Sequence, residues 1–172
     1  SIIVAADRYA AMCPPTPDGP AAILVCSEHY ARLLNGCAVE VVASTIGAPR
    51  AQQPRSPVVS ATTAAYEAAG IGPQDLDQIE LHDAAAPAEL IQYAEIGICE
   101  EGQAHHLLRN GVTALGGKLP VNTSGGLLSR GHPLGATGCA QIVELCTQLR
   151  GRADKRQVEG SRLALAVNGG GW

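Results

Sequence analysis

The chain has 172 residues, enough for one domain with a hydrophobic core, and 46% of them are apolar. It contains no Phe and one Trp, so Ala, Val, Leu and Ile must build that core. The formal net charge of -4 and the lack of a Lys or Arg cluster exclude a basic nucleic-acid-binding surface. No apolar run approaches the roughly 18 residues of a transmembrane helix, so neither a membrane span nor a signal peptide is expected.

The cysteines follow no spacing that is typical of a metal site, because no two of them form a Cys-x-x-Cys pair. Several lie in apolar runs, which favours buried, reduced thiols in a cytoplasmic protein. We therefore expect no metal. The six residues are Cys13, Cys26, Cys37, Cys99, Cys139 and Cys146.

The N-terminal third alternates apolar runs with turn-forming residues. Residues 1–12 are apolar and then mixed, and the proline-rich residues 13–20 indicate a loop. Residues 21–26 form a short, continuous apolar run that predicts a strand buried on both faces. Ser27 is a suitable N-cap for a helix through Leu34.

The middle of the chain continues the alternation of strands and helices. Residues 39–46 alternate and are β-branched, so they predict a strand, and residues 79–81 predict a second one. A loop over residues 82–87 follows the second strand. Helices are expected over residues 60–69, 88–96 and 103–110.

The stretch at residues 120–138 is dense in glycine and holds His132 before a proline. Glycines at this density indicate sharp turns or close approaches of the backbone. Apolar residues at helical spacing follow over residues 136–149, and residues 161–167 predict a last strand. His132 is thus expected in a tight loop that enters a helix N-terminus, where free N–H groups favour negative charge.

Two motifs resemble the thiolase superfamily, in its sterol-carrier-protein-type branch with the thiolase-like lipid-transfer proteins. One is Ser-Gly-Gly-Leu-Leu-Ser-Arg-Gly-His-Pro-Leu-Gly-Ala-Thr-Gly at residues 124–138, and the other is Glu-Leu-His-Asp-Ala-Ala-Ala-Pro-Ala-Glu-Leu at residues 80–90. The alternation of strands and helices itself indicates an α/β fold. The resemblance implies a thiolase-like C-terminal domain, with a mixed central sheet and helices on both faces.

The resemblance also implies a division of the chain. Residues 1–35 would be the tail end of the thiolase N-terminal half-domain, and residues 36–172 would be the C-terminal domain, truncated at its last strand. The nucleophilic cysteine of the family would then lie upstream of Ser1.

The resemblance gives the histidines their roles. In thiolases the residue matching His132 activates the nucleophilic cysteine and helps to form an oxyanion hole, and imidazole can do both near neutral pH. His82 matches a histidine that contributes to the same hole; alternatively, it is a strand-end histidine bonded to a backbone carbonyl. Asp83 is expected to cap the next turn. Arg130 is expected to be exposed, where it could contact a phosphate of coenzyme A or a neighbouring subunit.

Asn168 matches an asparagine beside the family's final glycine loop. The backbone N–H groups of Gly131, Gly169 and Gly170 would face an oxyanion, or these glycines would only permit close turns. Open α/β sheets form their sites at the carboxyl ends of strands, so the loops at His82, His132 and Asn168 are expected to meet.

Two positions depart from the family pattern. Ala84 stands where the sterol-carrier branch has an acid/base cysteine, and Val167 stands where that branch has a histidine. Neither side chain can move a proton, whereas Claisen chemistry requires a base at the acyl α-carbon.

Three functions follow from the resemblance. The first is an acyl-CoA acyltransferase whose oxyanion-hole histidines serve a nucleophile on the missing half. The second is a retro-aldolase that acts on a steroid or lipid side-chain CoA thioester and has an OB-fold partner. The third is a non-catalytic module that binds acyl-CoA or lipid. Coenzyme A enters as the substrate thioester and no bound cofactor is expected. A homodimer, or pairing with the chain's own N-terminal half, is expected.

Overall fold

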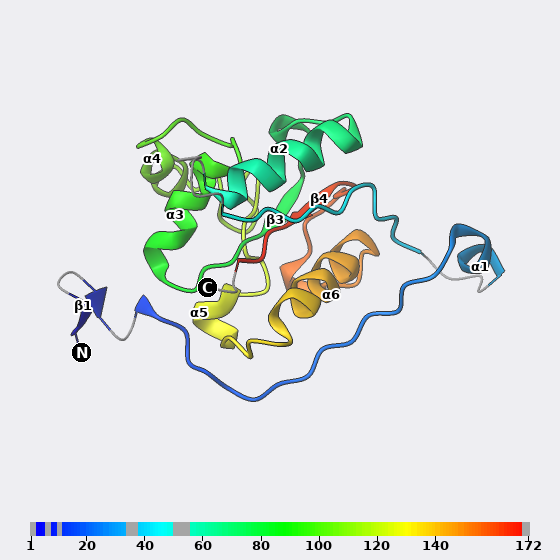
Figure 1. The fold of residues 1–172 in the computed structure, drawn as a ribbon, viewed down its shortest axis with the longest axis horizontal. Helices are drawn as coiled ribbons and strands as arrows, with labels where there is room; N and C mark the ends of the chain where they lie inside the picture. The colour runs from blue at the N-terminus through cyan, green and yellow to red at the C-terminus, as the bar shows by residue number, and fades with distance from the viewer. Residues whose placement is uncertain (1–2, 6–7, 10–11, 34–37, 50–55, 170–172) are drawn as a thin grey trace.

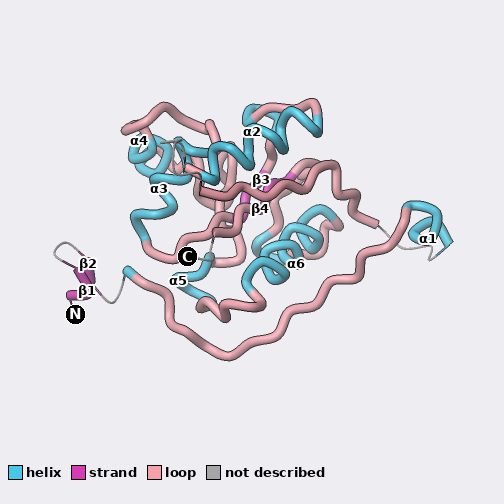
Figure 2. The backbone as a smooth tube through the Cα atoms, viewed as in Figure 1, coloured by secondary structure: helices cyan, strands magenta, loops and turns pink. Residues whose placement is uncertain are grey.

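The computed structural model describes residues 3–5, 8–9, 12–33, 38–49 and 56–169. Short helices and strands alternate along this part of the chain, with long loops between them (Figure 2). The elements are β1 (Ile3–Ala5), β2 (Arg8–Tyr9), α1 (Glu28–Leu33), α2 (Pro57–Ala69), η2 (Pro73–Asp75), β3 (Gln78–Glu80), α3 (Ala86–Glu95), α4 (Ala104–Arg109), α5 (Gly126–Arg130), α6 (Thr137–Leu149), η3 (Asp154–Arg156) and β4 (Ala164–Ala166).

The central sheet is parallel and lies between helices. Strands β3 and β4 pair in register from Gln78 opposite Ala164 to Glu80 opposite Ala166, and Ile79 forms a further parallel bridge to Val121. Helix α6 packs against this sheet, and α2, α3 and α4 lie on its other side (Figure 1). The predicted α/β class with helices on both faces is confirmed, although these paired segments are parallel rather than mixed.

The core lies between β3 and the helices α3 and α4. Ile79 and Leu81 are fully buried there with Tyr93 and Ile96 of the α3 segment. Because side chains alternate along a strand, Gln78 and Glu80 point to the opposite face and are also fully buried. Strand β3 therefore carries an apolar face toward α3 and a polar face toward the loops that surround α6.

Local sequence signals explain the ends of α2. Ser56 accepts a hydrogen bond on Oγ from the Val58 N–H, Pro57 occupies the first turn, and Gly70 ends the helix in the left-handed conformation. The helix begins three residues earlier than the predicted residues 60–69 because of this Ser-Pro cap. The predicted helices at 27–34, 88–96, 103–110 and 136–149 correspond to α1, α3, α4 and α6.

Two predicted strands are wrong for this structure. Residues 21–26 and 39–46 are neither helix nor strand, and both expose large apolar side chains, including Leu24 (84%), Val41 (70%) and Ile46 (97%). Their composition predicts a buried environment, but these large apolar side chains are exposed, and the contact of the second segment with α2 includes a hydrogen bond from the Thr45 hydroxyl to the Ala61 carbonyl at 2.8 Å. A strand needs a partner for its backbone groups, and these two segments have none among the described residues.

Candidate active site

His82 follows directly after β3 and is held by a glutamine from α3. The side chain of Gln92, which is 7% exposed, accepts a hydrogen bond from the His82 N–H at 3.3 Å and donates one to the His82 carbonyl at 2.7 Å. This pair of bonds imitates a further step of the sheet ladder. Helix α3 therefore fixes the backbone from which the imidazole projects.

His132 lies in the turn between α5 and α6. Its backbone N–H donates to the Pro15 carbonyl at 2.9 Å. Its ring Nδ1 lies 2.7 Å from the hydroxyl of Thr137, the first residue of α6. Gly131 has a φ of 87°, and a Cβ at that position would lie 2.3 Å from Pro17. Glycine is therefore required for the close approach of the proline-rich residues 13–20.

The two imidazoles meet at right angles. Their ring centroids are 4.8 Å apart and their planes make an angle of 85°. Burial lowers the pKa of His82, and the neighbouring His132 lowers it further, while Asp83 partly opposes both effects. The Nδ1 atom of His82 is buried and makes no hydrogen bond within the described part of the chain. The predicted meeting of the His82 and His132 loops is thus present in the structure.

Asp83 connects the same two loops through the backbone. Its carboxylate is 2% exposed and accepts hydrogen bonds from the N–H groups of Leu127 (2.8 Å) and Leu128 (3.4 Å) at the start of α5. A Cβ on Gly126 would lie 2.3 Å from this carboxylate. The expected capping role is present, but the capped helix lies 44 residues further along the chain, not in the next turn.

Asn168 is tied to α6. Its side-chain amide donates to the Gln141 Oε1 at 3.2 Å, and the Gln141 amide donates to the carbonyls of Leu81 (2.9 Å) and Val167 (3.0 Å). Gln141 is fully buried, so one side chain joins the residues immediately before His82 and Asn168. The strand ends are therefore neighbours, while the Asn168 amide bonds to Gln141 rather than to an imidazole.

The remaining predicted positions differ in their surroundings. Val167 is buried in the core and donates its N–H to the Glu80 carbonyl at 2.8 Å, whereas Ala84 is partly exposed. A Cβ on Gly169 would meet open space and its φ is not positive, so neither packing nor backbone strain requires glycine there. Gly170 lies outside the described residues.

The buried carboxylate of Glu80 contacts the segment that leads into the His132 turn. Glu80 accepts hydrogen bonds from the Ser124 N–H (3.0 Å) and hydroxyl (2.6 Å), and its Oε2 lies 3.7 Å from Arg130 Nη2. Burial raises the pKa of Glu80, although Ser124 and Arg130 act in the opposite direction. The expected exposure of Arg130 is wrong, because its side chain is 23% exposed and faces this carboxylate. A role in binding coenzyme A phosphates has no support from this geometry.

Sequence reasoning missed the glutamines and Thr137. Gln92 and Gln141 lie at ordinary helical positions, and their partners are 10 and 60 residues away, so no local signal marks them. Thr137 follows His132 by five residues at a helix start, where a hydroxyl within reach of the ring was a usable signal.

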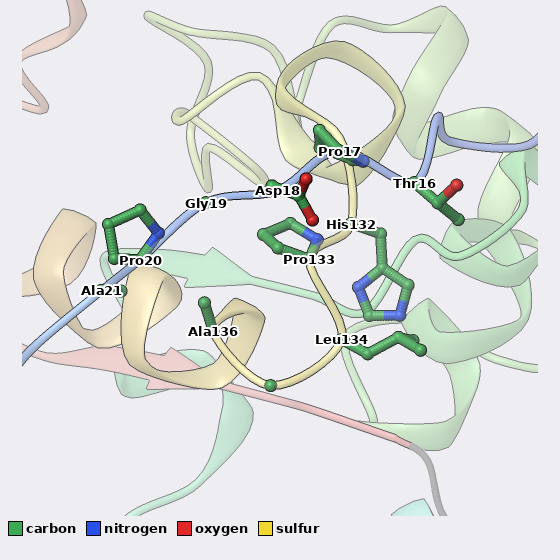
Figure 3. Close-up of a pocket in the computed structure, with 11 residues that line it drawn as sticks. Thr16, Pro17, Asp18, Gly19, Pro20, Ala21, His132, Pro133, Leu134 and Ala136 are labelled. Carbon is green, nitrogen blue, oxygen red and sulfur yellow. The ribbon is translucent and has the colours of Figure 1, made fainter.

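An open cleft of about 480 Å³ lies beside His132 (Figure 3). Residues 16–21 form one wall and residues 132–136 form the other, and in this view the His132 ring lies between Thr16 and Leu134. Its lining is mostly proline, glycine and alanine, with Asp18 as the acidic group. The volume falls within the usual range for small-molecule sites, about 300–1,000 Å³.

Among the residues that the structure describes, no group of three or more His, Cys, Asp or Glu side chains could hold a metal ion. Within the same ranges, none of the helices combines the length and the apolar character needed to cross a bilayer.

Comparison with known proteins identifies the family of the chain. The family model "Thiolase C-terminal domain-like" matches residues 43–172. Sterol carrier protein 2 of Rattus norvegicus is 45% identical over 168 residues, which cover 91% of this chain and 31% of the rat protein. An acetyl-CoA acetyltransferase of Methanothermobacter thermautotrophicus is 39% identical over 166 residues, covering 92% of this chain and 43% of that protein.

A solved structure, the Ltp2-ChsH2(DUF35) aldolase, superposes with a TM-score of 0.60 at 28% identity, covering 68% of this chain and 30% of that one. The chain thus spans less than half the length of each of these relatives. The family model nevertheless covers most of the chain. This protein therefore belongs to the thiolase family, as a member of its C-terminal domain-like group.

Proposed function

We propose that this chain supplies the oxyanion-binding half of a thioester site in a thiolase-like acyl-CoA acyltransferase. The observation that carries the proposal is the right-angled pair of His82 and His132, 4.8 Å apart at the carboxyl end of β3. The nucleophilic cysteine would come from a part of the protein outside these 172 residues. The acetyl-CoA acetyltransferase relative supports this reaction class.

The chemistry assigned to the pair is stabilisation of charge. When a thiolate attacks a thioester carbonyl, negative charge develops on the carbonyl oxygen, and pre-oriented N–H donors lower the barrier. Gln92 holds the backbone of His82 and Thr137 contacts the ring of His132, so little reorganisation is needed when the charge forms. Coenzyme A would arrive as the substrate thioester through the cleft beside His132.

The residues Ala84 and Val167 limit the step in which the carbon–carbon bond forms or breaks. Removal of the acyl α-proton, or protonation of the leaving enolate, needs a side chain that can exchange a proton, and neither residue has one. We therefore expect slow thiolysis of β-ketoacyl-CoA, with acyl transfer to and from the nucleophile less affected.

The test is acetoacetyl-CoA thiolysis by the full-length protein and matched variants. His132→Ala and His82→Ala should each reduce kcat about 10²–10³-fold, the usual effect of losing one oxyanion donor. His106→Ala, at an exposed position on α4, is the control and should leave the rate unchanged. Rates unaffected by either histidine variant would refute the assignment.

A retro-aldolase is the second candidate, and Ala84 together with the aldolase structure favours it. Retro-aldol cleavage needs a base at a hydroxyl and an oxyanion hole for the enolate, so it does not require a cysteine at position 84. An OB-fold partner protein belongs to this proposal. Cleavage of a β-hydroxyacyl-CoA with a steroid or lipid side chain, without thiolysis, would favour the aldolase; binding of both thioesters without turnover would favour a non-catalytic module.

A further inference from the structure

We propose that Thr137 is a positioning residue that sets the ring tautomer of His132, so that the neutral imidazole presents Nε2–H to the cleft. The inference deepens the proposed oxyanion role, on which its functional meaning rests. It distinguishes between the two tasks that a histidine here could perform, because an Nε2–H donates to an oxyanion and a bare Nε2 accepts a thiol proton.

Three atoms decide the tautomer. The Thr137 hydroxyl oxygen lies 2.7 Å from His132 Nδ1 and 3.1 Å from the Pro133 carbonyl oxygen. Thr137 is 1% exposed, so solvent is not an alternative partner. A hydroxyl has a single hydrogen, which can be given either to the ring nitrogen or to the carbonyl.

The carbonyl of Pro133 is already satisfied. It accepts hydrogen bonds from the N–H groups of Ala136 at 2.9 Å and Thr137 at 3.0 Å. A carbonyl oxygen has two lone pairs, so a third donor adds little there. The contact with Nδ1 is also the shorter one and matches the preferred length of a hydroxyl hydrogen bond. The hydroxyl hydrogen therefore goes to Nδ1, which must be unprotonated, and the ring hydrogen resides on Nε2.

This arrangement lets His132 act without being charged. In the neutral ring, Nδ1 is occupied as an acceptor and Nε2 is left as a donor, with His132 lining the cleft (Figure 3). The ring of His82 lies edge-on to it, with the two centroids 4.8 Å apart.

The test is ¹⁵N NMR of the full-length protein labelled in its histidine rings, above the ordinary imidazole pKa of about 6.5. His132→Asn identifies the His132 signals by their loss. The expected wild-type spectrum shows a pyridine-type Nδ1 and a pyrrole-type Nε2, and Thr137→Ser keeps this pattern. In Thr137→Val, loss of one hydrogen bond should reduce the excess of the Nε2–H tautomer about five- to tenfold.

Thr147→Val is the matched control, because the Thr147 hydroxyl, also on α6, bonds to the Val143 carbonyl at 2.7 Å and lies away from the site. It should leave the His132 signals unchanged, and circular dichroism checks that each variant is folded. A wild-type His132 protonated on Nδ1, or a Thr137→Val spectrum identical to wild type, would overturn the inference. The spectrum reports the tautomer whether or not the protein turns over a thioester, so a failure of the proposed enzyme activity is read separately.

Discussion

At His82, burial and a neighbouring imidazole act in the same direction. Both lower the pKa below the ordinary value of 6.5, and the partial opposition from Asp83 does not reverse the shift. The ring therefore favours the neutral form at neutral pH, as the proposed role of an uncharged donor beside His132 requires.

This shift predicts how stability depends on pH. As pH falls below 6.5, the unfolded chain binds a proton at His82 before the folded chain does, so the free energy of unfolding decreases until pH reaches the lowered folded pKa. His82→Asn should remove this part of the pH dependence and leave stability above pH 6.5 less affected. Urea denaturation across this window measures it, and His106→Asn serves as an exposed control. An identical pH profile for wild type and His82→Asn would contradict the shift.

Helix α6 links the three loops of the site at the level of secondary structure. Thr137 and Gln141 are one turn apart, so they project from the same face toward the His132 ring and the two strand ends. Helix α3 holds His82 from the opposite side of the sheet through Gln92. Side chains of two helices, α3 and α6, thus form hydrogen bonds to the residues that follow β3 and β4 and hold the site together.

Removing the hydrogen bonds of Gln141 on α6 should destabilise the ends of both strands together. Gln141→Leu leaves the carbonyls of Leu81 and Val167 and the amide of Asn168 without this partner, at a cost of about 1–3 kcal/mol of stability. Hydrogen exchange of amides near His82 and Asn168 should accelerate together. Gln92→Leu is the comparison, because it should affect only the His82 side. Unchanged exchange near Asn168 in Gln141→Leu would show that Gln141 does not hold the two strand ends together.

Whether a helix or strand could be predicted from the sequence depends on whether local or distant residues stabilise it. Helices such as α2 and α6 have their caps and apolar spacing in the local sequence, so they are predictable to within a few residues. Helix α5 is not, because its N-terminus depends on a carboxylate 44 residues away. The residues 21–26 and 39–46 have strand composition, but pairing depends on a partner that composition does not specify.

The site shows the same division. The two histidines are predictable because the Gly-His-Pro and His-Asp motifs resemble those of a known family, and the structure brings the two rings together. Gln92, Gln141 and Glu80 act through contacts that the folded topology creates, and a glutamine on a helix carries no such meaning in a sequence.

On the scale of the whole molecule, a large apolar surface is exposed along two segments. Ile23, Leu24 and Val25 lie on one of them, and Val41, Val42 and Ile46 lie on the other. Contiguous apolar side chains of this kind mark surfaces that bind another polypeptide. Another part of the protein or a second copy of the chain would cover them.

The isolated chain should therefore associate. Light scattering should give a mass above the 17.7 kDa of one copy, and Leu24→Glu with Ile46→Glu should shift it toward that value. Leu108→Glu, at an exposed position on α4, should not. A stable monomer before any substitution would refute this expectation.

The proline-rich wall over the cleft has a consequence for how the site is held in shape. Four of the eight residues at 13–20 are prolines, and each has a fixed φ and no N–H. Each such proline reduces the freedom of the unfolded chain, worth about 0.4–1 kcal/mol where the native backbone tolerates it. The wall therefore has an intrinsically extended form before it meets His132, and its Pro15 carbonyl accepts a backbone hydrogen bond from the His132 N–H.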